Sequence, residues 1–339
     1  MEKITKNWYP WLDYPYRQII KQYRTRCIHH TLLLHAPYGL GIEALLWKIS
    51  CLLMCSFSTS CGKCHNCKLM YAMTHPDLYI LNIKAGQTTL GIEQIREINE
   101  IIYHKSKLGT AKIIWILKSE KLTQSAVNAL LKIVENPPKK TWFFIYSLEK
   151  TNLPINLRSR CQPWYIIPPT EIEGLNWLKT NNDINNLPKV TLITALRLSY
   201  GAPIAALNLL RSSDWKNRKK IYDEILNNVF KLKIIKLLPL LKNENVAKQI
   251  EWLCTLLVDA LKTKHTDKTH IINSDYYELV KKLADCISTE ALLLAFKQWC
   301  ICRYRILHVT SISQELLLIK PLIVWNQLVQ PNVNITTTR

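Results

Sequence analysis

The chain has 339 residues, of which 48% are hydrophobic and 21% are charged, so it can form the cores of two or three domains. It contains no run of about 18 uninterrupted apolar residues and no apolar segment close to residue 1, so we expect a cytoplasmic protein without a membrane span or secretory signal. The net charge of +20 fits contact with nucleic acid, but the basic residues are dispersed and AT-rich coding would produce the same bias, so both interpretations stay open.

Strand and helix signals alternate in the first half of the chain. Apolar runs predict strands over residues 32–35, 77–83, 112–117 and 141–146. Apolar residues recur at helical spacing between these strands, most clearly over residues 91–104 and 124–135. The near-continuous apolar run at 112–117 is typical of a strand that is buried on both faces of a parallel sheet. We therefore predict an α/β fold with a mainly parallel sheet.

The pattern changes at Pro168 and Pro169, beyond which strand signals nearly vanish. Short helical patterns are followed by longer helical periods, some of which are apolar around much of their circumference, as in residues 291–294 and 316–319. Such stretches must be buried inside the domain or against a partner. The predicted domains are an α/β domain over 1–167, a small helical domain over 168–210 and an all-α domain over 211–336.

The loop after the first predicted strand resembles a phosphate-binding loop that has lost its working residues. It keeps Gly39 and Gly41, but Ile42 replaces the lysine that reaches the phosphates, and Glu43 replaces the hydroxyl that holds Mg²⁺. An apolar group and a carboxylate cannot perform these two tasks beside a triphosphate. We therefore predict that the chain has no functional ATP site of its own.

Four cysteines follow within thirteen residues: Cys55, Cys61, Cys64 and Cys67. Two overlapping C-x-x-C steps place thiolates close together, and four thiolates are a ligand set that Zn²⁺ favours in structural sites. An iron–sulfur centre is an alternative, although a ferredoxin-type run would have a further cysteine that is followed by proline. Unligated thiols are the other alternative. The remaining cysteines on apolar stretches are expected in the core: Cys27, Cys254, Cys286, Cys300 and Cys302.

A triplet of Ser159, Arg160 and Cys161 lies after the last predicted strand of the α/β domain. An isolated triplet of this kind is most simply a surface arginine that caps a loop. Its meaning here depends on the motifs around it.

Taken in order and spacing, these motifs resemble the delta-prime subunits of the bacterial DNA polymerase III clamp loader, which are AAA+ proteins that do not hydrolyse ATP. The resemblance covers nearly the whole chain. It rests on Trp-Tyr-Pro-Trp at 8–11, His-His at 29–30, Thr-His-Pro-Asp at 74–77, Asn-Ala-Leu-Leu-Lys at 128–132, Glu-Asn-Pro-Pro at 135–138 and Leu-Arg-Ser-Arg-Cys at 157–161.

This resemblance implies an AAA+ domain with a zinc module, a helical lid and a helical collar that assembles a ring. It implies that Arg160 serves as an arginine finger for the ATP site of an adjacent tau/gamma subunit. Arg158 could form an ion pair within the domain and is the less favoured finger. The other partners would be the delta subunit, the sliding clamp indirectly, and primed DNA through the complex. The chain would be no enzyme alone but a component of a DNA-directed DNA polymerase, a nucleotidyltransferase.

Two further departures from the ATPase members support this assignment. Residues 118–121 lack their acidic pair after the third strand, and Ile204 stands where their lid carries an arginine. The main alternative is a zinc-containing AAA+ ATPase of the tau/gamma type, which would need a cation near the phosphates. Another alternative is a zinc-ribbon protein that binds nucleic acid, for which only Phe57 and Tyr71 lie near the cysteines as stacking aromatics.

Overall fold

The computed structural model describes residues 7–25, 27–83, 87–148, 153–228, 237–242, 245–265, 271–309 and 312–328. The chain divides into two compact units, Met1–Pro169 and Thr170–Arg339. The second unit contains both of the helical segments that the sequence predicts beyond Pro168. The outer ends of the first and third predicted domains, residues 1–6 and 329–336, lie outside the described residues.

The first unit is built on a five-stranded sheet in which every pairing is parallel, as the alternating pattern predicts. The strand order is β2-β3-β4-β1-β5. The strands are β1 (Thr31–His35), β2 (Leu78–Leu81), β3 (Lys112–Ile116), β4 (Thr141–Ser147) and β5 (Gln162–Tyr165). All residues of β1 and β3 are buried, which explains the apolar runs 32–34 and 113–116 within them.

Strand β5 was not predicted from the sequence. It has only four residues and contains Pro163, which cannot donate a ladder hydrogen bond. It pairs with β1 at the edge of the sheet, where a missing donor is tolerated. A four-residue segment that contains a proline is too short and too atypical for its sequence pattern to predict a strand.

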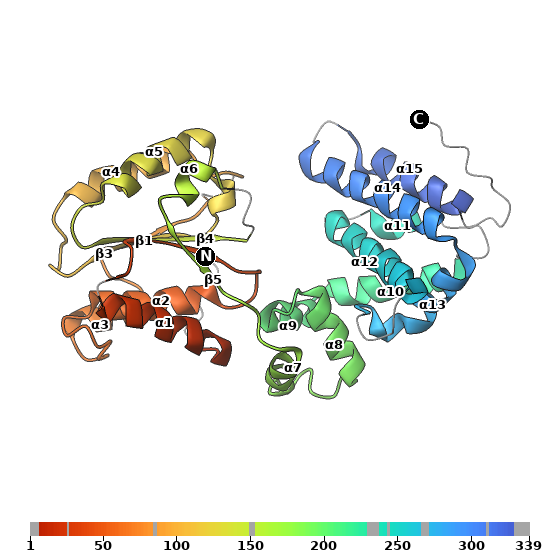
Figure 1. Cartoon of the computed structure of the whole chain (residues 1–339), viewed down its shortest axis with the longest axis horizontal. Coiled ribbons are helices and arrows are strands. Elements are labelled where there is room, and N and C mark those ends of the chain that lie inside the picture. Colours follow the sequence, from red (N-terminus) through yellow and green to blue (C-terminus); the bar gives the residue numbers. More distant parts are fainter. Residues whose placement is uncertain are drawn as a thin grey trace. The chain divides into compact units, whose positions relative to one another are not determined.

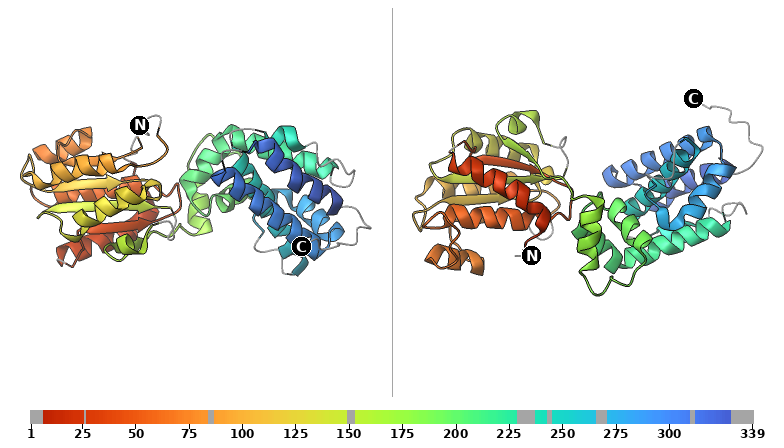
Figure 2. Two further views of the ribbon diagram at one scale, coloured as in Figure 1. Left: turned by 90° about the horizontal axis from the view of Figure 1, so that it is seen from above. Right: turned by 60° about the horizontal axis from the view of Figure 1, so that its bottom comes forward.

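Helices cover both faces of this sheet (Figures 1 and 2). One face carries α1 (Asp13–Arg24), α2 (Ile42–Met54) and α3 (His65–Ala72), and the other carries α4 (Ile92–Tyr103), α5 (Gln124–Glu135) and α6 (Ile155–Arg158). Two 3-10 turns, Pro10–Leu12 and Ser119–Lys121, complete the unit. The apolar faces of α4 and α5 pack on the sheet, where Ile98 of α4 and Leu130 of α5 share one core cluster with Ile145 of β4.

Helix α5 matches its predicted range, and its two ends have clear physical causes. The Thr123 side chain accepts a hydrogen bond from the amide of Ala126 and caps the N-terminus, as the sequence predicts. Pro137 and Pro138 follow Asn136 and prevent the helix from continuing. Glu135 is therefore fixed as the last helical residue.

The second unit begins with three short helices, α7 (Glu171–Lys179), α8 (Lys189–Leu198) and α9 (Pro203–Arg211). A capping box between Thr170 and Glu173 starts α7. Gly174 allows α7 and α8 to approach closely, because a Cβ at this position would lie 2.9 Å from the Leu196 side chain.

The rest of the second unit is helical: α10 (Ser213–Asn228), α11 (Leu238–Leu241), α12 (Val246–His265), a 3-10 turn (Ser274–Tyr276), α13 (Tyr277–Cys286), α14 (Thr289–His308) and α15 (Gln314–Leu328). Helix α12 packs against α13 and α14, and α14 packs against α15. The fully buried Arg218 guanidinium donates to Asp275 at 2.7 and 2.9 Å and to Asn273 at 2.8 Å. This buried ion pair ties α10 to the segment before α13.

No single helix in the described part of the chain is long and apolar enough to cross a membrane. Helices α8 and α9 reach the length and apolar composition of a membrane span only when they are taken together, and the two are bent by 113° relative to each other.

Candidate functional site

The Ser-Arg-Cys triplet forms a tight turn directly after α6. Cys161 is buried and its thiol donates to the Leu157 carbonyl at 3.1 Å, while the Ser159 hydroxyl donates to the Asn156 carbonyl at 3.0 Å. Burial raises the pKa of Cys161 to about 12, so the thiol stays protonated and keeps this donor. The serine and the cysteine thus fix the turn, and Arg160 is left exposed between them.

Two acceptors hold the Arg160 side chain. Its Nε lies 2.5 Å from Oε1 of Glu135, and its Nη1 donates to the Asn156 carbonyl at 2.9 Å. The side chains of the ion pair are 40% and 43% exposed. The guanidinium has five N–H groups, so these two contacts leave three of them, two on Nη2 and one on Nη1.

The sequence left open that Arg158 could form an ion pair within the domain, but it is Arg160 that pairs with a carboxylate. Arg158 is exposed, and its side chain makes no hydrogen bond or ion pair with any of the residues that the structure describes. The reason is the place of Glu135, which ends α5 beside the turn that follows α6. Sequence reasoning missed Glu135 as the partner, although it opens the Glu-Asn-Pro-Pro block at 135–138.

The degenerate loop keeps two glycines in the left-handed backbone conformation directly before a helix. Gly39 and Gly41 have φ values of 87° and 78°, which residues with a side chain rarely adopt, and Gly41 leads directly into α2. Ile42 is buried in the core at the first position of α2. The Trp11 indole donates to the Leu40 carbonyl at 2.9 Å and holds the loop from the outside.

The charge around the loop is acidic. Burial raises the pKa of Tyr146, and the negative charges of Glu43, Glu120 and Tyr38 raise it further, so both carboxylates lie close to this ring. The Tyr146 hydroxyl donates to the Ala36 carbonyl at the start of the loop. Glu43 lies in the first turn of α2, directly after the loop, so a phosphate placed there would be repelled by its carboxylate.

Lys48 does not supply a cation to the loop. Its Nζ lies 3.5 Å from the centre of the Trp8 ring and 4.7 Å from that of Tyr16, which is a cation–π arrangement. Burial lowers the pKa of Lys48, and the charge of Asp13 opposes this effect. The lysine therefore faces the aromatic N-terminal segment.

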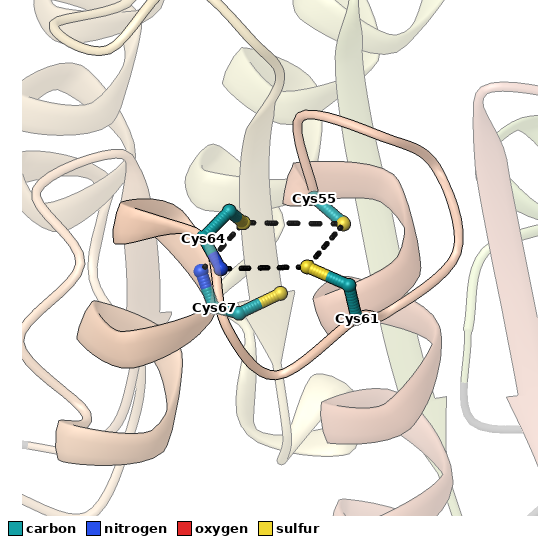
Figure 3. A group of neighbouring side chains, drawn as sticks. All are labelled: Cys55, Cys61, Cys64 and Cys67. Atoms are coloured by element: carbon teal, nitrogen blue, oxygen red, sulfur yellow. Dashed lines mark hydrogen bonds between the residues drawn. The ribbon is translucent and has the colours of Figure 1, made fainter.

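The four cysteines predicted as metal ligands converge on one point (Figure 3). Their sulfur atoms all lie within 4.8 Å of one another. Cys55 follows the end of α2, Cys64 caps the N-terminus of α3, and Cys67 lies in the first turn of α3. The Sγ of Cys55 is 3.7 Å from that of Cys61 and 4.0 Å from that of Cys64, so the group could hold one metal ion.

Backbone amides favour the thiolate form at this site. Burial raises the pKa of Cys55, but the amides of Cys61, Thr59 and Phe57 outweigh it and lower the pKa to about 5. Burial and the neighbouring Cys64 and Cys55 side chains raise the pKa of Cys67. The amides around Cys55 thus favour the thiolate, which is the form that binds a metal.

The remaining cysteines follow the prediction only in part. Cys254 and Cys302 are buried in the helical core, as expected. Cys27, Cys286 and Cys300 are exposed, because each lies on the outer side or at the end of its segment.

Comparison with known proteins gives one consistent result along the chain. Family models match residues 13–170 (DNA polymerase III, delta subunit), residues 169–211 (DNA polymerase III subunit delta', AAA+ ATPase lid domain) and residues 212–327 (DNA polymerase III, delta subunit, C terminal). The parallel sheet, the lid helices and the C-terminal helices thus fit an AAA+ clamp-loader architecture.

Individual relatives agree with the family models. The DNA polymerase III subunit delta' of Yersinia pestis is 39% identical over 94% of this chain and 95% of its own length. The DNA polymerase III subunit delta' of Escherichia coli K12 is 37% identical over 96% of this chain and 97% of its own length. The tau/gamma subunit of Haemophilus influenzae is 24% identical over 60% of this chain and 30% of its own length.

Proposed function

The chain belongs to the delta-prime family of DNA polymerase III subunits, and from this premise we propose that it acts as a non-hydrolysing clamp-loader subunit. In this role it presents Arg160 in trans to the ATP site of a neighbouring ATPase subunit of the tau/gamma type. The observation that carries the proposal is the combination of an acidic, lysine-free phosphate loop with an outward-facing arginine on a fixed turn.

The loop supports the lack of hydrolysis through both packing and charge. An ATPase needs a mobile lysine at the position of Ile42. Here the Ile42 side chain is instead buried in the core, so it cannot reach a phosphate. Glu43 and Glu120 contribute negative charge near Tyr146, which disfavours a bound triphosphate. Among the described residues, neither Ile42 nor Lys48 supplies the cation that a tau/gamma-type ATPase requires at this loop.

The arginine turn supports the function in trans. A guanidinium that reaches a γ-phosphate neutralises charge as it develops during phosphoryl transfer, and this needs free donors at an accessible edge. Arg160 keeps three N–H groups beyond its two described contacts. Ile155, at the start of the short helix α6 that precedes this turn, is 79% exposed and offers an apolar contact for a docking partner.

We also infer that the cysteine group binds one structural zinc ion. Four sulfurs at the usual Zn–S distance of about 2.3 Å occupy the corners of a tetrahedron and lie about 3.8 Å apart. The sulfur separations of 3.7 Å and 4.0 Å fit this geometry. Because all four ligands are thiolates, Zn²⁺ here would stabilise the fold and leave no open position for catalysis.

Helices α14 and α15 support assembly through the C-terminal domain. Ala291, Leu292, Leu317 and Leu318 are buried, but the same two helices expose other apolar side chains: Leu293, Ile301, Tyr304, Leu307, Leu316, Ile319 and Ile323. We propose that this surface contacts the tau/gamma and delta subunits. The sliding clamp and primed DNA would then be engaged through the assembled complex.

Reconstitution tests the proposed function. The purified chain should show no ATPase above background and weak or no Mg-ATP binding. Mixed with tau/gamma and delta subunits, it should be required for full clamp-stimulated ATPase and for clamp loading on primed DNA. Steady ATP turnover by the purified chain, or a complex that loads clamps equally well without it, would contradict the proposal.

A further inference from the structure

The contact between Glu135 and Arg160 joins two motifs that lie 25 residues apart. Glu135 opens the Glu-Asn-Pro-Pro block and ends α5, while Arg160 lies in the turn after α6. The prolines at 137 and 138 fix where α5 ends, so they also fix where the carboxylate is presented. The Glu-Asn-Pro-Pro block therefore does more than end α5, because it also places a carboxylate beside Arg160.

From this arrangement we propose that Glu135 is a positioning residue for the arginine finger, an inference that rests on the proposed function of Arg160. The carboxylate holds Nε at 2.5 Å, and the Asn156 carbonyl holds Nη1 at 2.9 Å. Anchors on two different nitrogens fix the direction of the guanidinium plane. The Nη2 end then remains for a phosphate of the neighbouring subunit.

A purely stabilising role does not account for this pair. Exposed ion pairs contribute at most about 1 kcal/mol to folding, and these two side chains are 40% and 43% exposed. An arginine loses substantial rotamer entropy when it is held in one geometry. A finger that is held before the partner docks has already lost this entropy, so a larger share of its contact energy is available during phosphoryl transfer.

The test compares Glu135→Ala and Glu135→Gln in the reconstituted complex, with all ATP sites except the one facing this subunit disabled. We expect Glu135→Ala to lower kcat by roughly two- to five-fold, the equivalent of an exposed ion pair, with little change in KM. Glu135→Gln should fall between the wild type and the alanine variant, because an amide oxygen still accepts from Nε. Asp183→Asn is the matched control, since Asp183 pairs with the Nε of Arg211 at 2.6 Å with similar exposure, 51% and 47%, and should not affect kcat.

A double variant separates positioning from other effects. Combined with Arg160→Ala, Glu135→Ala should have no additional effect, because it acts through the arginine. An additional loss in the double variant, or a kcat that is unchanged or raised by Glu135→Ala while Arg160→Ala remains impaired, would overturn the positioning role alone. A wild-type kcat in Arg160→Ala would instead overturn the proposed function, and the positioning role with it.

Discussion

Replacing Arg160 by alanine separates what this side chain does for folding from what it does for a partner. Its ion pair with Glu135 is close to half exposed, and pairs of this kind contribute about 0–1 kcal/mol. The turn itself is held by Leu157, Ser159 and Cys161, which the substitution does not touch. We therefore expect Arg160→Ala to lower the melting temperature by at most about 2–4 °C.

The expected loss of rate is much larger. Arginine fingers in well-studied GTPases contribute about 10³ to 10⁵ in rate, which corresponds to about 4–7 kcal/mol of transition-state stabilisation. Only the ATP site that faces this subunit should lose that contribution, so the total rate of a complex with several sites should fall less. A large functional effect with a small folding effect is the signature of a finger.

The assay is clamp-stimulated ATPase and clamp loading on primed DNA, with metal content, melting temperature and co-purification measured for each variant. Arg160→Lys should restore little activity, because an ammonium group lacks the planar fork that meets two phosphate oxygens. Arg158→Ala should have a smaller effect than Arg160→Ala. A complex with Arg160→Ala that loads clamps at the wild-type rate would refute the reasoning.

Three further predictions concern the stability of the two units. Cys64→Ser should abolish stoichiometric zinc binding and destabilise the first unit in a melting experiment, because zinc binding energy is also folding energy; metal analysis that finds iron, or an unchanged melting temperature without metal, would contradict this. Arg218→Ala leaves Asp275 without its buried partner and should cost about 3–5 kcal/mol in urea unfolding of the second unit. Burial lowers the pKa of His75 from 6.5, so the unfolded chain binds a proton there before the folded one does, and stability should fall as the pH drops below about 6.5. His75→Asn can still accept the Asp77 amide and should reduce this loss between pH 7.5 and pH 5, whereas an unchanged pH dependence would count against the assignment.

The sequence by itself determined the features that depend on local spacing and residue type. Apolar runs predicted β1, β3 and β4, because a strand buried on both faces is mainly apolar, and an alternating pattern predicted β2. The spacing of Cys55, Cys61, Cys64 and Cys67 predicted a common site, since short loops force neighbouring thiols together. The replacement of lysine by Ile42 indicated a defective phosphate loop, because an apolar side chain cannot neutralise the charge of a phosphate.

Only the tertiary structure decided which distant side chains meet. It paired Arg160 rather than Arg158 with a carboxylate, because the end of α5 lies beside the turn after α6. It also placed Glu43 and Glu120 near Tyr146, although these residues come from three separate segments of the chain. In a parallel sheet such neighbours are set by strand order and helix packing, which local sequence periodicity does not encode.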